Sequence, residues 1–349
     1  MPYENSALWL AKRGAELTVG PAPYTPPGAD EVVVRVHAVA VNPVDGIPGI
    51  AYRFVLPWLT FPAVIGSDLA GEIVEVGDNV TRLKPGNRVL GMATGLERSR
   101  NRAAEGAFQK YTVLMQHMVS PISDELSFEQ AAVLPLALST AATGLFQQDH
   151  LALPLPTLDA PDRGQTVLVW GGSSSVGSNA IQLARCAGYR VITTASPHNF
   201  EYVRSLGAEA AIDYHNGTAV DELVEAIGER PLAGILAVTR GSVVPAVAIA
   251  QRTTGTRRIA AAQPALMTRV QLLRSRPRGV SVSAIWGGTL KDNEVGPGIY
   301  VDFLPSALAS GAYRAAPRAV VVGDGLKHIP GAIDQLGKGV SAKKLVVQV

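Results

Sequence analysis

Residues 166–184 read TVLVWGGSSSVGSNAIQLA, and this stretch decides the fold. The apolar run at 167–170 is typical of a buried parallel strand. Small residues and then a helical pattern follow, so backbone N–H groups at the positive end of a helix are available to a pyrophosphate. Gly172, Ser174 and Gly177 match the spacing G-x-G-x-x-G with serine in the middle, which is a weak signal when it stands alone. The correct order of strand, turn and helix strengthens it.

The residues predicted to hold the pyrophosphate are Gly171, Gly172, Ser173, Ser174, Ser175, Val176 and Gly177. The three serine hydroxyls are expected to add to the backbone donors. The alternative is that they form a plain serine-rich turn.

The bulk numbers favour a globular protein of two domains, because 349 residues are too many for one ordinary core. The net charge is only +2, so nucleic-acid binding has no electrostatic basis. Residues 97–102 are locally basic and are interpreted as a solvated loop, with an anion contact as the alternative. The single cysteine, Cys186, is expected to be a packed thiol.

No segment approaches the ~20 apolar residues that a membrane helix needs. The N-terminal residues lack a cationic start followed by an apolar core, so no secretory signal is expected. These observations together predict a cytoplasmic protein.

Two patterns divide the chain. Residues 1 to about 122 contain β-branched runs separated by Pro- and Gly-rich turns, which indicates a small barrel. A helix is predicted over 128–146. Strands and helices then alternate, which indicates a parallel sheet covered by helices. The predicted strands are 166–170, 190–194, 210–213, 234–238 and 257–262, and the predicted helices are 175–187, 198–206, 219–227 and 243–251. The C-terminal residues 343–349 are predicted to form a strand that returns to the first domain.

The end of the second strand bears on cofactor preference. An NAD-preferring fold usually has Asp or Glu near this point, whereas this chain has Ala195 and Ser196. Without a carboxylate to repel a 2′-phosphate, and with Ser196 and Asn199 near it, NADPH is favoured over NADH. The alternative role of Ser196 is to cap the helix that starts at Pro197.

Several short motifs occur in one order along nearly the whole chain. They are Asn42-Pro43-Val44-Asp45, residues 66–71 (GSDLAG), Gly106-Ala107-Phe108, Leu134-Pro135 with Thr140-Ala141, the loop 171–177, Leu206-Gly207-Ala208 with Asp213-Tyr214, and Gly339-Val340-Ser341 with Lys344. In these motifs the chain resembles the medium-chain dehydrogenase/reductase superfamily, within it the zinc-independent quinone-reductase and trans-acting enoyl-reductase branch.

The resemblance implies an α/β protein with a GroES-like β-barrel catalytic domain and a Rossmann domain, a doubly wound parallel sheet. The implied boundaries are 1–124 for the catalytic domain, completed by 288–349, and 125–287 for the Rossmann NADP(H)-binding domain. It also implies that Tyr214, Val238 and Lys344 contact the cofactor. A half-buried tyrosine at a strand end is the alternative for Tyr214.

The resemblance argues against zinc. Zinc members of the superfamily have Cys, His and Glu where this chain has Asn42, Ser67 and Asp68, and catalytic zinc usually takes three such ligands. Asp45 and Asp68 are expected to hold backbone turns. Without a metal to polarise a carbonyl, a conjugated C=C bond is the expected site of reduction.

Thr140, Asn42 and Tyr52 are the candidate catalytic residues. The resemblance implies that Thr140 faces the nicotinamide, and the alternative is a helical Thr bonded to a backbone carbonyl. Asn42 is expected to hold cofactor or substrate, or to serve only as a turn residue. The resembling enzymes commonly have a lysine at the position of Gly46 or Ile47, so Tyr52 or Arg53 is the substitute proton donor, with ordinary loop residues as the alternative.

The expected substrate is small and hydrophobic. One interpretation is that 54–61 lines its cleft, with Trp286 and Tyr300 opposite, and the other is that 54–61 fills a core. The expected function is NADPH-dependent reduction of an enoyl, enone or quinone substrate by a monomer or homodimer, without membrane or nucleic-acid partners. The alternatives are a metal-free carbonyl or imine reductase or alcohol dehydrogenase, and an inactive NADPH-binding scaffold.

Overall fold

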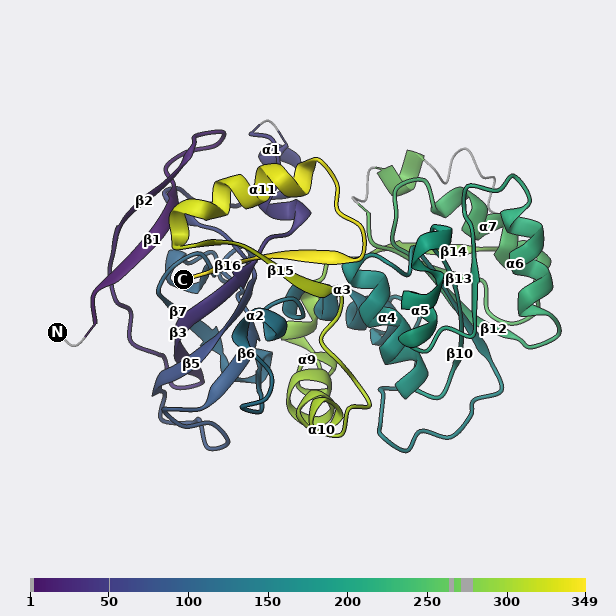
Figure 1. Ribbon diagram of the computed structural model, residues 1–349, viewed down its shortest axis with the longest axis horizontal. Coiled ribbons are helices and arrows are strands. Elements are labelled where there is room, and N and C mark those ends of the chain that lie inside the picture. The colour runs from purple at the N-terminus through teal and green to yellow at the C-terminus, as the bar shows by residue number, and fades with distance from the viewer. Residues whose placement is uncertain (1–2, 50, 264–266, 271–278) are drawn as a thin grey trace. The chain divides into compact units, whose positions relative to one another are not determined.

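The computed structural model describes residues 3–49, 51–263, 267–270 and 279–349. The chain forms two compact units (Figure 1). Unit 1 comprises Met1–Leu136, Leu304–Ala309 and Arg318–Val349, and unit 2 comprises Ala137–Phe303 and Ser310–Pro317. Unit 1 is therefore built from three separate segments of the chain.

Unit 1 contains two sheets. One has the strand order β2-β1-β4, and the other has the order β15-β16-β3-β5-β6-β8, with β7 also paired to β3. The strands are β1 (Asn5–Leu10), β2 (Leu17–Ala22), β3 (Glu31–Ala40), β4 (Ala63–Val64), β5 (Asp68–Val76), β6 (Arg88–Met92), β7 (Tyr111–Met115), β8 (Val119–Pro121), β15 (Arg318–Asp324) and β16 (Lys343–Gln348).

The C-terminal strand confirms one prediction. β16 pairs antiparallel with β3, with Val346 opposite Ala40, so the end of the chain returns to the first unit.

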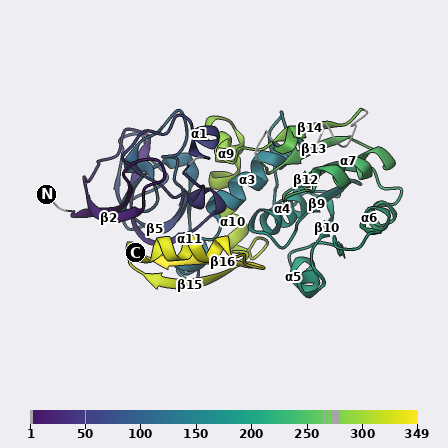
Figure 2. The same cartoon turned by 90° about the horizontal axis from the view of Figure 1, so that it is seen from above.

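The helices of unit 1 are α1 (Tyr52–Val55), α2 (Phe128–Ala131), α10 (Leu304–Ala309) and α11 (Ile329–Gly337). Among them, α11 lies along β15 and β16 (Figures 1 and 2).

Unit 2 contains a six-stranded sheet in the order β11-β10-β9-β12-β13-β14, in which every pair is parallel. Its strands are β9 (Thr166–Trp170), β10 (Arg190–Thr194), β11 (Ala210–Ile212), β12 (Leu232–Ala237), β13 (Arg258–Ala261) and β14 (Ser281–Ala284). Its helices include α3 (Pro135–Phe146, which starts in unit 1), α4 (Ser175–Cys186), α5 (Phe200–Ser205), α6 (Ala219–Ile227), α7 (Val243–Arg252) and α9 (Val295–Pro297). The predicted alternation of strands and helices is confirmed.

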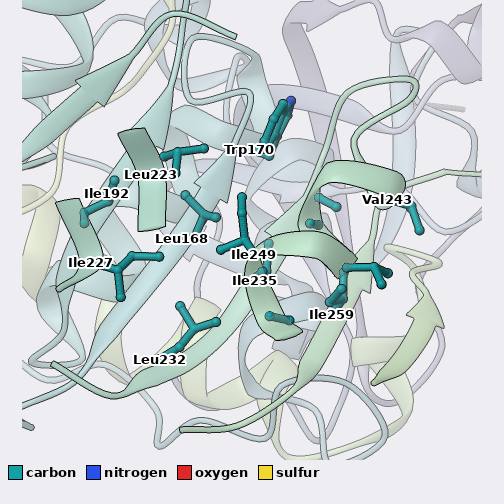
Figure 3. Packing of buried hydrophobic residues seen from close by; sticks show 14 of the residues in the cluster. Leu168, Trp170, Ile192, Leu223, Ile227, Leu232, Ile235, Val243, Ile249 and Ile259 are labelled. Carbon is teal, nitrogen blue, oxygen red and sulfur yellow. The ribbon is translucent and has the colours of Figure 1, made fainter. Parts of the chain in front are cut away.

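The core of unit 2 explains why the run at 167–170 is apolar on both faces. Leu168 and Trp170 pack against α6 and α7 residues such as Leu223 and Ile249 (Figure 3). Val167 and Val169 are also fully buried, on the opposite face, because successive side chains of a strand alternate. Each such side chain contributes about 1.5–3 kcal/mol on burial.

The single helix predicted over 128–146 is wrong. The structure has α2 and then α3, which begins at Pro135. Ser127 and Gln130 form a capping box at the start of α2. Pro135 has no N–H and disfavours the helical conformation of the residue before it, so it starts a new helix rather than continuing the old one.

None of the helices among the described residues combines the length and apolar character needed to cross a membrane.

Candidate functional site

The strand order of unit 2 locates a ligand-binding edge. The chain enters the sheet at β9, continues outward through β10 and β11, and then returns to the other side of β9 with β12. In open parallel sheets, ligands bind beyond the carboxyl ends of the strands at the point where this order reverses. The loops that follow β9, β10, β11 and β12 all lie at that edge.

The loop after β9 is shaped by two glycines and the neighbouring strand. The N–H groups of Gly171 and Gly172 donate to Oγ1 and O of Thr194, both at 2.9 Å. Gly171 has a φ of +97°, a conformation that L side chains rarely adopt. A Cβ on Gly172 would lie 2.2 Å from Thr193 Oγ1. Only glycine lets the loop sit this close to β10.

The start of α4 presents free donors. Ser174 caps the helix, because its Oγ accepts from the N–H of Gly177 at 3.0 Å and donates to the carbonyl of Gly171 at 2.7 Å. Within the described residues, the N–H groups of Ser173, Ser175 and Val176 have no hydrogen-bond partner. Unpaired N–H groups and the positive helix end favour an anion here.

The same helix start fits a pyrophosphate for a steric reason. A Cβ on Gly177 would lie 2.2 Å from the carbonyl oxygen of Gly171, so the helix approaches the loop as closely as backbone allows. The hydroxyl of Ser174 is used inside the protein, so backbone N–H groups, rather than this side chain, are the donors available to a phosphate.

The loops after β10 and β11 bring Ser196 and Tyr214 together. Their hydroxyl oxygens lie 3.4 Å apart. The ring of Tyr214 is 41% exposed and lies against that of His215, with ring centroids 4.0 Å apart and the ring planes tilted by 33°. Ser196 precedes a short helix but makes no side-chain cap bond to it. Ser196 therefore occupies the N-cap position that the alternative predicts, but its hydroxyl makes no bond to the helix backbone and lies near Tyr214 instead. Asn199 in the same loop is buried.

Sequence reasoning missed Asp213 at this edge. Its carboxylate accepts from the N–H of His215 at 3.0 Å and lies 2.7 Å from His215 Nδ1. The backbone N–H of His215 lowers the pKa of the Asp213 carboxyl. The available signal was the spacing Asp-x-His after a strand, which is typical of an Asx turn. The carboxylate is thus engaged by its own turn.

Val238 directly follows β12, and its N–H donates to the carbonyl of Trp170 at 3.0 Å. The next residue, Thr239, is also close, because a Cβ built on Gly171 would lie 2.5 Å from its Cγ2. The structure therefore places the predicted residue Val238 beside the loop that follows β9.

In unit 1 a buried polar cluster joins three distant parts of the chain. Lys344 Nζ lies 2.9 Å from Asp68 Oδ2 and donates a hydrogen bond to Asn42 Oδ1. Asn42 Nδ2 also donates to Asp68 Oδ2, at 2.8 Å. Asp68 and Lys344 are 0% and 4% exposed. The amide of Asn42 and the ammonium of Lys344 are thus committed inside unit 1, and their assignment to cofactor or substrate stays a prediction.

Both carboxylates of this region hold backbone groups, the role that sequence analysis favoured. Asp68 Oδ1 accepts from the N–H of Leu136, and Asp45 Oδ2 accepts from the N–H of Asn42 at 2.7 Å. Burial above all, with the nearby Asp68 carboxylate, raises the pKa of Asp45 to about 7, although Asn42 and Lys344 act in the opposite direction.

Tyr52 is 4% exposed and lines a cavity in unit 1 together with Asp45. Burial, with the Asp45 carboxylate, raises the pKa of the Tyr52 hydroxyl to about 12. The hydroxyl therefore remains protonated near neutral pH and is available as a donor. The interpretation of Tyr52 as an ordinary surface residue is wrong.

Thr140 lies on α3 within unit 2. Its Oγ1 is close to Gly287, where a Cβ would approach it to 2.3 Å. Tyr300 is fully buried and its hydroxyl lies 2.8 Å from Ser139 Oγ. Tyr300 is therefore a core residue of unit 2, and the interpretation of it as a wall of a substrate cleft is wrong.

The apolar segment 54–61 is partly buried and partly exposed. Leu56 and Leu59 are core residues, whereas Phe54 is 80% exposed.

The locally basic segment 97–102 is not simply a solvated loop, since Arg100 and Arg102 form ion pairs with Glu31 and Glu105.

The single cysteine, Cys186, is buried, as predicted for a packed thiol, and burial raises the pKa of its thiol.

Comparisons with known proteins agree with both units. Residues 28–124 match the family model "Alcohol dehydrogenase GroES-like domain", and residues 175–298 match the model "Zinc-binding dehydrogenase". The chain is 47% identical to "Dehydrogenase orf1" of Aspergillus niger, with 98% of each chain covered. It is 35% identical to "Trans-enoyl reductase himH" of Aspergillus japonicus, covering 99% of this chain and 97% of that one.

Among solved structures, the quinone oxidoreductase from Coxiella burnetii superposes with a TM-score of 0.72 at 24% identity, covering 99% of this chain and 100% of that one. This likeness concerns the fold. Together with the family models it confirms the predicted fold class, a GroES-like domain plus a Rossmann-type parallel sheet.

The description of the second family model names zinc, but the residues that the structure describes do not offer the usual ligands of a zinc site. At the cluster in unit 1, the Asp68 carboxylate is already paired with the Lys344 ammonium, which would repel a second cation. Among the described residues, no three His, Cys, Asp or Glu side chains are grouped so that they could hold a metal ion.

The residues at the edge of the unit 2 sheet do fit a nicotinamide dinucleotide, because the unpaired N–H groups of Ser173, Ser175 and Val176 at the start of α4 are available to a pyrophosphate. The extent of the match to curated relatives settles the family. The chain belongs to the medium-chain dehydrogenase/reductase superfamily and is an oxidoreductase of that type.

Proposed function

We propose that this protein is an NADPH-dependent, zinc-independent reductase of a C=C bond conjugated to a carbonyl. The observation that carries the proposal is the buried pair of Asp68 and Lys344. The Lys344 ammonium is paired with the Asp68 carboxylate, which a metal ion at this site would need as a ligand. Reduction of a carbonyl needs a strong electrophile on its oxygen, whereas a conjugated C=C bond needs only hydrogen bonds to the developing enolate.

The preference for NADPH over NADH rests on the loops after β10 and β11. Ser196 and Tyr214 present adjacent hydroxyl groups, and the nearest strand-end carboxylate, Asp213, is engaged by His215. Hydroxyl groups accommodate a 2′-phosphate, while a free carboxylate would repel it.

When bound, the reduced nicotinamide supplies the hydride. The N–H groups of Ser173, Ser175 and Val176, which have no partner in the protein, would hold its phosphates. Asn42 is proposed to act as a positioning residue through its bonds to Asp68 and Lys344. Thr140 and Tyr52 remain the proposed hydrogen-bond donors toward the substrate, and the protonated Tyr52 hydroxyl suits that role.

The relative named a trans-enoyl reductase supports reduction of an enoyl-type substrate. We propose that the substrate is small and hydrophobic and of the enoyl, enone or quinone type. We propose that the protein acts as a monomer or homodimer in the cytoplasm.

The test is NADPH consumption against matched enones, quinones and saturated aldehydes, on protein dialysed against a chelator and checked by elemental analysis. The expected result is turnover of conjugated substrates without zinc. Activity on aldehydes alone would favour a carbonyl reductase, and tight NADPH binding without any turnover would favour a scaffold; both outcomes contradict the proposal. Stoichiometric zinc that is needed for activity would also overturn it.

A further inference from the structure

Unit 1 contains a cavity of about 440 Å³ whose walls come from unit 1 alone. Three segments enclose it: the turn between β1 and β2, the loop from Asp45 to Tyr52, and the first turns of α11. A cavity of this size is in the range of small-molecule sites. Its walls combine polar groups with aliphatic side chains, namely Leu10, Leu17, Ile47, Ile65 and Ile333.

The charged side chains among the described residues that line the cavity are all acidic. Glu16, Asp45 and Asp334 line it, and the described lining residues include no Lys, Arg or His. Glu16 and Asp334 are exposed, whereas Asp45 is 4% exposed. Carboxylates at the surface and one below it, without a compensating cation in the wall, attract a positively charged ligand.

The buried carboxyl at the cavity has an unused acceptor. Asp45 Oδ2 accepts from the N–H of Asn42, but Asp45 Oδ1 is buried and has no hydrogen-bond partner among the described residues. Buried polar atoms are nearly always paired, because an unpaired one loses its hydration without replacement. A ligand that brings an N–H donor to Asp45 would remove this deficit.

The geometry distinguishes between kinds of cation. No three acidic or other ligating side chains in the described part of the chain are grouped closely enough for a metal ion. Metal ions such as Ca²⁺ need six or more oxygen ligands at one point. Separated carboxylates with aliphatic side chains such as Leu17, Ile47 and Ile333 between them suit instead a cation with a short hydrocarbon body.

We propose that this cavity binds a small organic ammonium, with its nitrogen at Asp45 and its apolar body against Leu17, Ile47 and Ile333. The inference rests on the contacts of unit 1. Tyr52, proposed above as a donor toward the substrate, lines the same cavity, but binding of the ammonium does not require the proposed reaction to occur.

Titration calorimetry on the 349-residue protein tests it at pH 8, above the pKa of about 7 of the Asp45 carboxyl, so that this group is ionised. The three probes have one shape: benzylammonium, benzyl alcohol and benzoate. Charge-assisted hydrogen bonds are roughly twice as strong as neutral ones, so benzylammonium is expected to bind at least about tenfold more tightly than benzyl alcohol. Benzoate is expected not to bind. Equal or tighter binding of the alcohol, or no binding of benzylammonium at millimolar concentration, would overturn the proposal.

Variants assign the binding to this cavity. Asp45→Asn keeps an oxygen for the N–H of Asn42 and is expected to lower benzylammonium affinity to that of the alcohol. Glu16→Gln combined with Asp334→Asn is expected to weaken binding about threefold, as for exposed charges. The exposed Glu125→Gln, away from the cavity, is the matched control and should change nothing.

Should Asp45→Asn fail to fold, Ile333→Trp provides the second assignment. Ile333 is half-buried in the wall, so the larger side chain fills the cavity from its open side. Loss of benzylammonium binding in this variant supports the proposal. Unchanged binding in Ile333→Trp and in the Glu16 and Asp334 double variant would place the ligand elsewhere and refute it.

Discussion

Lys344 Nζ lies 2.9 Å from Asp68 Oδ2, and neither side chain is more than 4% exposed. The two residues are far apart in the sequence and meet because β3 pairs with both β16 and β5. A buried charge is tolerated when its partner and its hydrogen bonds are in place, and here Asn42 and the N–H of Leu136 complete the set. Each charge is therefore needed by the other.

We expect Lys344→Met to destabilise the protein by about 3–5 kcal/mol, because it leaves the Asp68 carboxylate buried without a cation. Urea unfolding measures this as a lower midpoint with an unchanged slope. The neighbouring Lys343→Met is the control, since Lys343 is exposed on the same strand. Adding Asp68→Asn to Lys344→Met should recover part of the loss. Equal stability of the Lys343→Met and Lys344→Met variants would contradict a stabilising ion pair between Lys344 and Asp68.

Asp45 predicts a pH dependence of stability. Its pKa is about 7 in the folded protein, above the ordinary 3.8. The folded state therefore holds this proton longer than the unfolded state does, and the contribution of Asp45 to stability is complete below about pH 4 and is lost as pH rises to 7. At one pKa unit per 1.36 kcal/mol, the loss is up to about 4 kcal/mol.

The measurement is the free energy of unfolding of wild type and Asp45→Asn between pH 4 and pH 8. The variant is expected to gain stability relative to wild type as pH rises, because its amide never ionises. The exposed Asp324→Asn should run parallel to wild type. A constant difference between wild type and Asp45→Asn at every pH would show that the Asp45 carboxyl titrates normally.

The elements of unit 2 were predictable because each carries its own signal. The continuous apolar run of β9 and the small residues that open α4 place the loop at 171–174 without any knowledge of the rest of the chain. The break between α2 and α3 is also encoded, in Pro135, but the alanine-rich pattern around it is equally typical of one continuous helix. Local chemistry therefore accounts for most of this fold.

The arrangement in unit 1 could not be predicted in the same way. Nothing near Lys344 in the sequence shows that its ammonium faces Asp68, because that contact depends on the pairing of strands from opposite ends of the chain. Tyr300 shows the same limit, since a tyrosine in an irregular segment is equally compatible with a cleft wall and with the buried position bonded to Ser139. Contacts over long sequence separations need the tertiary structure.

Gly177→Ala should impair cofactor binding. The new Cβ would lie 2.2 Å from the carbonyl oxygen of Gly171, so the loop and the start of α4 must separate and the phosphate donors move. We expect NADPH affinity to fall at least about tenfold, equivalent to 1.4 kcal/mol, as measured by fluorescence titration. Gly217→Ala is the matched control, because a Cβ there meets nothing within 4 Å. A folded Gly177→Ala protein with wild-type NADPH affinity would refute the placement of the pyrophosphate.

Ser196→Asp should reverse the preference between the two dinucleotides. The variant places a carboxylate beside Tyr214, where the adenosine 2′-phosphate is proposed to bind. Repulsion at about 4 Å in a partly exposed site is worth up to about 4 kcal/mol, so at least a tenfold loss in NADPH affinity is expected. NADH affinity should hold or improve, because the carboxylate can accept from the free ribose hydroxyl.

The ratio of NADPH to NADH dissociation constants, measured by calorimetry, is the deciding quantity, since general damage to the site would weaken both alike. Ser281→Asp serves as the control: Ser281 is exposed at the start of β14, at the opposite end of the parallel strands, so the same charge there should leave the ratio unchanged. If Ser196→Asp also leaves it unchanged, the 2′-phosphate does not bind between the loops after β10 and β11, and the basis for preferring NADPH disappears.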